Sequence, residues 1–323
     1  MKRLLFIIIN YSLLIINSGS LTAQLRWVNV DSLYQPLPTS VHVFKTTDSL
    51  DGKPNIAFYL IADLNDKKLL FDADTTLKRR LTPMQFYQKN NQPIVVVNTT
   101  FFSFQTNQNL NVVIKDGKLV GYNVHSIPGR GKDTLTYRHV FGSAIGITDK
   151  RKVDVAWIYT DTILSHPYEI LSGIQVYKDS VNDFDPRKPR RSDLREWRMK
   201  TAIGGGPVLL QNGRIKITNN EELKFAGKAI DDKHPRTAIG YTKDNKLIIL
   251  VIQGRFPGIA EGANLKQEAK ILQDLGCWEA LNLDGGGSSC MLVNGKQTIK
   301  PSDPTGQRPI PAVFIINNRK ATK

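Results

Sequence analysis

Short apolar runs separated by turn residues predict a chain built mainly from β-strands. The runs 94–97 and 247–252 are continuous and apolar, which is typical of strands covered on both faces. An Asp-Gly pair at 116–117 and Asn-Gly pairs at 212–213 and 294–295 predict three tight hairpins. The segments expected to pair across these turns are 111–115 with 118–122, 207–211 with 214–218, and 290–293 with 296–299.

Two helices carry clear start signals. Thr82 is a good N-cap, followed by a proline and, three residues after the cap, a glutamine, which predicts a helix running to about Asn90. Asn264 and Gln267 form a similar capping box before apolar residues at helical spacing, and Gly276 is expected to end that helix.

Length and composition place the chain among globular proteins with a sizeable core. It has 323 residues, of which 41% are hydrophobic, and no repeat or long linker divides it after residue 23. We therefore expect an α+β fold: a single domain with a mixed or antiparallel β-sheet core flanked by a few helices. In this domain 24–89 is the N-terminal part, and 90–323 carries the motifs. The segment 178–200 is expected to be an exposed insertion.

The first 23 residues (1–23) predict a signal peptide. Lys2 and Arg3 precede the apolar stretch 4–16, and the small residues of 20–23 end just before Gln24. The alternative, an uncleaved membrane anchor, is disfavoured because the apolar stretch is too short. We expect an exported protein, periplasmic or secreted, with no membrane span after signal cleavage.

The chain is basic, with a formal net charge of +15, which favours acidic partners such as phosphate-bearing polymers. Many Lys and Arg residues lie between 187 and 200, with Trp197 among them. Cations together with an aromatic ring are typical of nucleic-acid binding. Prolines and acidic residues interrupt the segment, however, which favours a solvated loop. An exported protein rarely meets nucleic acid, so we expect no nucleic-acid partner.

The most informative segment predicts an anion-binding loop at a strand end. Glycines let the backbone approach a ligand closely, and loops of this kind form nests of N–H donors that hold phosphate. The apolar run 280–283, which includes Asn282, ends in a carboxylate, three glycines and two hydroxyls: Asp284, Gly285, Gly286, Gly287, Ser288 and Ser289.

Four further segments place polar groups where a strand meets a loop, which is where sheet proteins assemble binding sites. They contain an amide at the end of a buried strand, a second glycine run, a His-Pro-Arg-Thr sequence before a strand, and an arginine before the last strand. The candidate residues in them are Asn98, Gly205, Gly206, His234, Arg236, Thr237 and Arg308.

Cysteine and metal chemistry contribute little to the expected site. Cys277 and Cys290 are the two cysteines. Export would permit a bridge between them, but we expect two small buried residues. No cofactor and no metal are expected, although Asp284 and Asp303 could bind a divalent cation if they converge.

Taken in order, these motifs resemble the phosphodiester glycosidase family over roughly residues 90–317. The strongest part runs from Pro235–Gly240 through 282–288 to 294–295. Two features depart from the family's pattern: Thr99 and Thr100 stand where the family usually has glycine or alanine and glycine, and Gln267 stands where it tends to have Glu.

The resemblance implies cleavage of the bond between a sugar's anomeric carbon and a phosphodiester oxygen. Arg236 and Arg308 are suited to bidentate phosphate contact. Asp284 is either the nucleophile or the base that activates water, or it only braces the glycine loop. His234 is either a proton shuttle or a surface residue of a loop. The residues expected to bind substrate are Asn98, Gly205, Gly206, Thr237, Asn282, Gly285, Gly286, Gly287, Ser288, Ser289 and Arg308.

The expected function is hydrolysis of glycosyl-1-phosphodiesters in glycans or glycoconjugates, releasing a sugar such as N-acetylglucosamine. The expected partner is a phosphorylated glycan or glycosyl-phosphodiester substrate. One alternative is a non-catalytic module on the same fold that binds phosphorylated glycans. Another is a phosphatase-like hydrolase in which water attacks phosphorus.

Overall fold

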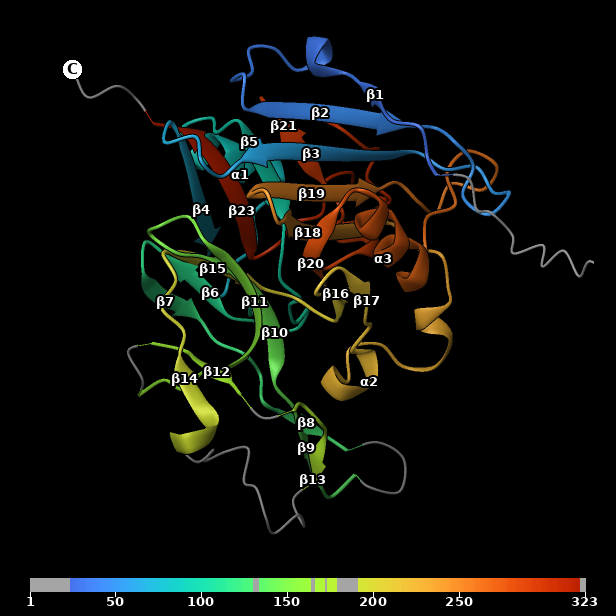
Figure 1. Ribbon diagram of the computed structural model, residues 1–323. Helices are drawn as coiled ribbons and strands as arrows, with labels where there is room; N and C mark the ends of the chain where they lie inside the picture. The colour runs from blue at the N-terminus through green and yellow to red at the C-terminus, as the bar shows by residue number, and fades with distance from the viewer. Residues whose placement is uncertain (1–23, 130–133, 164–165, 172, 179–190, 320–323) are drawn as a thin grey trace, which may run out of the picture.

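The computed structural model describes residues 24–129, 134–163, 166–171, 173–178 and 191–319. The expected signal peptide at 1–23 and the part 179–190 of the expected insertion lie outside the described residues. The strands of the described chain form four β-sheets, and all their pairings are antiparallel (Figure 1). The expectation of a mixed or antiparallel sheet core with few helices is therefore met in its antiparallel form, and the fold is more strongly β than an α+β label suggests.

The largest sheet has eight strands in the order β1-β2-β3-β19-β18-β20-β16-β17. Its strands are β1 (Val28–Asn29), β2 (Val41–Thr46), β3 (Ala57–Asp63), β16 (Val208–Gln211), β17 (Arg214–Ile215), β18 (Arg236–Thr242), β19 (Lys246–Ile252) and β20 (Cys277–Asn282).

The other three sheets have five, seven and three strands. The five-stranded sheet has the order β22 (Lys296–Gln297), β21 (Met291–Val293), β5 (Val95–Asn98), β23 (Ala312–Asn318) and β4 (Leu69–Thr75). The seven-stranded sheet has the order β14 (Leu194–Glu196), β12 (Tyr168–Ile170), β11 (Val153–Tyr159), β10 (Gly142–Ile147), β15 (Thr201–Gly204), β6 (Val113–Lys115) and β7 (Lys118–Gly121). The three-stranded sheet has the order β13 (Tyr177–Lys178), β9 (Tyr137–His139) and β8 (Ser126–Pro128).

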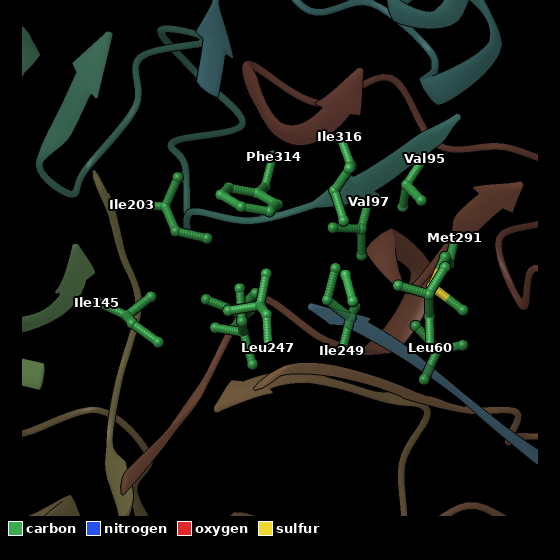
Figure 2. Close-up of a cluster of buried hydrophobic side chains, with 14 of the residues drawn as sticks. Leu60, Val95, Val97, Ile145, Ile203, Leu247, Ile249, Met291, Phe314 and Ile316 are labelled. Carbon is green, nitrogen blue, oxygen red and sulfur yellow. The ribbon is translucent and has the colours of Figure 1, made fainter. Parts of the chain in front are cut away.

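The main core lies where the three larger sheets meet. Figure 2 shows Leu60 and Ile249 of the eight-stranded sheet pointing toward Val97 and Phe314 of the five-stranded sheet, with Ile145 of the seven-stranded sheet beside them. Strand β19 alternates between two cores, because successive side chains of a strand point to opposite faces. The prediction that 94–97 and 247–252 are covered on both faces is confirmed.

Three α-helices are described: α1 (Pro83–Lys89), α2 (Asn219–Glu222) and α3 (Leu265–Asp274). Both predicted capping boxes form, at Thr82 for α1 and at Asn264 for α3. Helix α3 packs on the outer face of the eight-stranded sheet, and α1 packs on the five-stranded sheet. Short 3-10 turns occur at Asp31–Leu33, Arg191–Asp193, Gly227–Ile230 and Gly286–Ser288.

The three predicted hairpins are confirmed as β6–β7, β16–β17 and β21–β22. Each turn has two residues with positive φ, as Asp-Gly and Asn-Gly turns of this kind require. Strand β17 ends at Ile215, earlier than expected, although the N–H groups of Lys216 and Thr218 still donate to carbonyl oxygens of β16.

The structure also locates the two cysteines and Trp197. Cys277 and Cys290 are free and buried, as expected. Trp197 is buried and donates through Nε1 to Asp154 at 2.7 Å, so its ring is not available for stacking with a base. Within the described residues, no helix combines the length and the apolar character needed to cross a membrane.

Candidate active site

Asn98, at the end of β5, ties together the two sheets that build the site. Its Nδ2 donates to the carbonyl oxygen of Asp284, and its Oδ1 accepts from Thr237 Oγ1 at 2.9 Å and from the N–H of Cys290 at 3.0 Å. The N–H of Asp284 donates to the carbonyl oxygen of Thr99 at 2.7 Å. These bonds hold the ends of β5, β18 and β20 together, so the predicted convergence of strand ends is present.

Several backbone N–H groups of the glycine loop are already hydrogen-bonded to carbonyl oxygens of the protein. The N–H of Gly286 donates to Pro235, that of Ser288 to Gly285, and that of Ser289 to Gly286, at 2.8, 3.2 and 3.2 Å. These three N–H groups are therefore already satisfied by carbonyl oxygens, and the expected anion cradle of free N–H donors does not form from them. The N–H groups of Ser288 and Ser289 are used within the 3-10 turn at 286–288, and that of Gly286 joins the loop to Pro235, just before β18.

Asp284 stands at the mouth of this loop with a half-buried side chain. Burial raises the pKa of Asp284 to about 7, against the lowering effects of the Ser288 hydroxyl, Arg308, the Gly285 N–H and Arg255. A carboxyl with this pKa exists in both protonation states near neutral pH. It is thus suited to accept or give a proton during a reaction.

Two arginines lie against the glycine triplet. A Cβ at Gly287 would lie 2.1 Å from Nη2 of Arg308, and one at Gly286 would lie 2.9 Å from Nη2 of Arg255. Arg308 is held by Asp303, with Nε 2.6 Å from Oδ2, and its Nη1 donates to Ser288 Oγ at 3.4 Å. The glycines therefore leave room for two guanidinium groups beside Asp284.

Arg255 is a site residue that the sequence reasoning missed. No hydrogen bond or ion pair engages its guanidinium within the described residues, and the side chain is exposed. A usable signal was present, since Arg255 follows the apolar strand 247–252 after only two residues, Gln253 and Gly254. A cation at a strand end is the same feature that identified Arg308.

Arg236 does not face the loop as expected. Its side chain is 2% exposed, its Nε donates to the carbonyl oxygen of Ala263 at 2.8 Å, and its Nη2 donates to that of Asp232 at 3.2 Å. The guanidinium also lies over the ring of Phe225, at 5.6 Å. Because its fork is bound to backbone oxygens, Arg236 braces the loops around the site and is not placed for bidentate phosphate contact.

His234 lies beside Arg236 and pairs through its backbone with Ala263. Burial lowers the pKa of His234, and the charges of Arg236 and Arg255 lower it further. Its Nδ1 is buried without a hydrogen-bond partner among the described residues. A neutral imidazole results near neutral pH, which fits a proton acceptor better than a proton donor.

Gly205, Gly206 and Asn282 join β15 to β20. Asn282 Nδ2 donates to the carbonyl oxygen of Gly206 at 2.7 Å, and the N–H of Gly206 donates to that of Asn282 at 2.7 Å. A Cβ at Gly205 would lie 2.4 Å from the Asn282 carbonyl oxygen. These bonds hold the backbone of the second glycine run against the end of β20. The buried Oδ1 of Asn282 and the hydroxyls of Thr99 and Thr100 lack partners within the described residues.

Asp303, which was considered with Asp284 as a possible cation ligand, is engaged by an arginine. In the part of the chain that the structure describes, no group of three or more His, Cys, Asp or Glu residues is arranged to hold a metal ion. The carboxylate of Asp303 is occupied by Arg308, and burial of Asp303 is outweighed by hydrogen bonds from Thr305 and Arg308 that lower its pKa. Asp303 therefore positions a guanidinium.

Known proteins resemble this chain in sequence and in fold. Over 109 residues, 31% of the chain, it is 30% identical to the N-acetylglucosamine-1-phosphodiester alpha-N-acetylglucosaminidase of Mus musculus and 33% identical to that of Homo sapiens. Each match covers 21% of the relative, so the chain spans about a fifth of the length of these curated relatives.

Two solved structures have a similar fold. The catalytic domain of the zebrafish N-acetylglucosamine-1-phosphodiester alpha-N-acetylglucosaminidase, auto-inhibited by its pro-peptide, matches with a TM-score of 0.60 and 22% identity, over 92% of this chain and 89% of that one. A hypothetical protein from Synechocystis matches with a TM-score of 0.58 and 15% identity, over 90% and 63% of the two chains. A sequence model of the phosphodiester glycosidase family matches residues 91–317, most of the chain, and the protein belongs to that family.

Proposed function

We propose that this protein hydrolyses the bond between the anomeric carbon of a sugar and the phosphate of a glycosyl-1-phosphodiester in glycans or glycoconjugates, releasing a sugar such as N-acetylglucosamine. The observation that carries the proposal is the half-buried Asp284, with a pKa of about 7, beside the guanidinium groups of Arg255 and Arg308. Membership of the phosphodiester glycosidase family and the activity named for the mammalian relatives support the same reaction.

The proposed reaction needs cations at the phosphate and a carboxylate at the sugar. A phosphate monoester is a good leaving group, so stabilising its negative charge matters more than protonating it. Arg255 and Arg308 supply that stabilisation through charge-assisted hydrogen bonds. Either water attacks the anomeric carbon and gives its proton to the ionised Asp284, or Asp284 attacks first and water then hydrolyses the glycosyl ester and returns the carboxylate. In both cases the bond from the anomeric carbon to the phosphate oxygen breaks, and the phosphate keeps the electron pair.

The test is turnover of UDP-N-acetylglucosamine and of a methyl phosphodiester of N-acetylglucosamine 1-phosphate, with free sugar as the product measured. The wild type should release sugar, and Asp284→Asn should lose nearly all activity while remaining folded by circular dichroism. Asp274→Asn is the matched control, because Asp274 is far from the loop and pairs with Lys270 on the surface of α3. Tight binding without any release of sugar would favour a binding module.

Water enriched in heavy oxygen distinguishes attack at carbon from attack at phosphorus. Label in the released sugar supports the proposed glycosidase reaction. Label in the phosphate product would contradict it and identify a phosphatase-like hydrolase.

We also propose that the protein acts outside the cytoplasm, in the periplasm or after secretion. The basic start and apolar stretch within 1–23 support this location. N-terminal sequencing of the protein recovered from cell fractions tests it, and a chain in the cytoplasmic fraction that still begins at Met1 would contradict it.

A further inference from the structure

The segment 222–225, here called the hook, follows α2 and is held rigidly. Leu223 has φ 49° and ψ 39°, a left-handed conformation that is uncommon for a bulky side chain and turns the chain sharply. The side chain of Asn219 accepts the N–H of Phe225 and donates to its carbonyl oxygen, both at 2.9 Å. The backbone on both sides of Lys224 is therefore fixed.

Glu222 anchors the start of the hook with an unusually complete set of donors. Its Oε1 accepts from Trp157 Nε1 at 3.2 Å, Val208 N–H at 3.1 Å and Thr218 Oγ1 at 2.6 Å. Its Oε2 accepts from the N–H of Ser143 at 3.2 Å and from Ser143 Oγ at 2.6 Å. The carboxylate oxygens therefore have their hydrogen bonds without Lys224, which leaves the donors of the ammonium group unused.

Lys224 is half-buried and presents its ammonium group without an oxygen partner. Its stem passes over Gly206, where a Cβ would lie 2.3 Å from Cε, and its Nζ lies 5.3 Å from the centre of the Phe101 ring. No hydrogen bond or ion pair engages Nζ within the described residues. Burial lowers the pKa of Lys224, and the charge of Glu222 only partly opposes this. A cation held this way is stabilised when an anion binds beside it.

Lys224 lines a pocket of about 380 Å³. Phe101, Asn111, Val124, Ile127 and Val140 form much of the rest of its wall. Phe101 follows Thr99 by two residues, and Thr99 accepts the N–H of Asp284 at 2.7 Å. In Figure 1, α2 lies between the β16–β17 hairpin and the small sheet of β8, β9 and β13. The pocket is lined from both sides, by Ile127 and Pro128 of β8 and by Glu222 at the end of α2.

We propose that this pocket is a second anion-binding subsite, in which Lys224 binds an anionic oxygen group that the substrate carries in addition to the phosphodiester being cleaved. The inference rests on the proposed function, since it assigns part of the substrate to that same site. Two sources supply this chemistry: the carboxylate of an acidic sugar, or the second phosphate of a diphosphate. The Phe101 ring lies beside the ammonium, with Nζ 5.3 Å from its centre.

The experiment compares wild type and Lys224→Met on three substrates. UDP-glucuronic acid carries a sugar carboxylate, UDP-glucose carries a second phosphate but no carboxylate, and the methyl phosphodiester of glucose 1-phosphate carries neither. Lys224→Met should raise KM about tenfold to a hundredfold for a substrate with the recognised group, because a charge-assisted hydrogen bond is lost. The kcat values and the methyl diester kinetics should stay unchanged. Lys228→Met, in the exposed turn after the hook, is the matched control.

The pattern across substrates decides the result. A rise in KM for UDP-glucuronic acid alone identifies a carboxylate subsite, and an equal rise for both UDP-sugars identifies the second phosphate. An equal loss on all three substrates, or no change on any, overturns the proposal.

A binding measurement tests the subsite even if the proposed hydrolysis does not occur. If the wild type hydrolyses none of the three substrates, calorimetric titration with UDP-glucuronic acid and UDP-glucose still measures the subsite. Weakening of about tenfold in Lys224→Met but not in Lys228→Met supports it. Equal affinity in both variants, or no binding by the wild type, refutes it.

Discussion

Gly287→Ala should separate activity from stability. A Cβ at this position would lie 2.1 Å from Nη2 and 2.4 Å from Cζ of Arg308. Ordinary contact needs at least 3.4 Å, so the guanidinium must retreat by about 1 Å or more. A displacement of this size at a group that stabilises the leaving phosphate should lower kcat/KM by about a hundredfold.

The same substitution should affect folding little. Gly287 does not have positive φ, so alanine fits its backbone, and the atoms it would displace are at the end of a flexible side chain. We expect the free energy of unfolding, measured by urea denaturation, to change by less than about 1 kcal/mol. Gly285→Ala is the contrast, because its Cβ would lie 2.8 Å from the backbone oxygen of Pro235 and should destabilise the fold.

A double-mutant cycle with Arg308→Ala tests the stated cause. If Gly287→Ala acts by moving Arg308, it should cause little further loss in the Arg308→Ala background, since the guanidinium is already absent. A full hundredfold loss in that background, or full activity in Gly287→Ala alone, would refute the reasoning.

Four further predictions concern Asp284, Glu222 and the two cysteines. Activity should rise with pH through about 7 as Asp284 ionises, and a flat kcat/KM profile between pH 6 and 8 would contradict its role. The pKa of Asp284 is raised on folding, so the folded wild type loses stability as pH rises from about 4 to about 7 and the buried carboxyl ionises. The amide of Asp284→Asn does not ionise, so the melting temperature of the variant should exceed that of the wild type by a growing margin across this window. Glu222→Gln should lower the free energy of unfolding by about 3 kcal/mol, because an amide NH₂ would face donors; a change under about 1 kcal/mol in urea would count against this. Burial raises the pKa of Cys277 and Cys290 to about 12, so neither should react with a thiol reagent until the protein is unfolded, and rapid labelling of the native protein would disprove their burial.

Local chemistry made the hairpins and helix starts predictable. A turn with two positive φ values needs residues such as Asn-Gly, and a capping box needs its two side chains three residues apart. Both requirements are met within a few residues, so the sequence around Asn294 or Thr82 is sufficient. The long apolar strand 247–252 was recognisable for the same reason.

The arrangement of the site was only partly predictable. Asn98 and Asp284 are 186 residues apart, and their proximity followed from their strand-end positions and from the family resemblance. The direction of the Arg236 side chain did not follow, because the neighbouring carbonyl oxygens of Ala263 and Asp232 belong to loops with no recognisable pattern. The hook was unpredictable because Glu222 collects its donors from segments far apart in the chain.

Asn98 lies at the seam between the five-stranded sheet, through β5, and the eight-stranded sheet, through β18 and β20. Its amide links the two sheets through hydrogen bonds to Asp284, Thr237 and Cys290. The position of Asp284 therefore depends on how the two sheets pack against each other. A slip between these layers would move the carboxyl relative to Arg308, which is attached to the chain leading into β23. The alignment of Asp284 with Arg308 is therefore set in part by the packing of the protein interior.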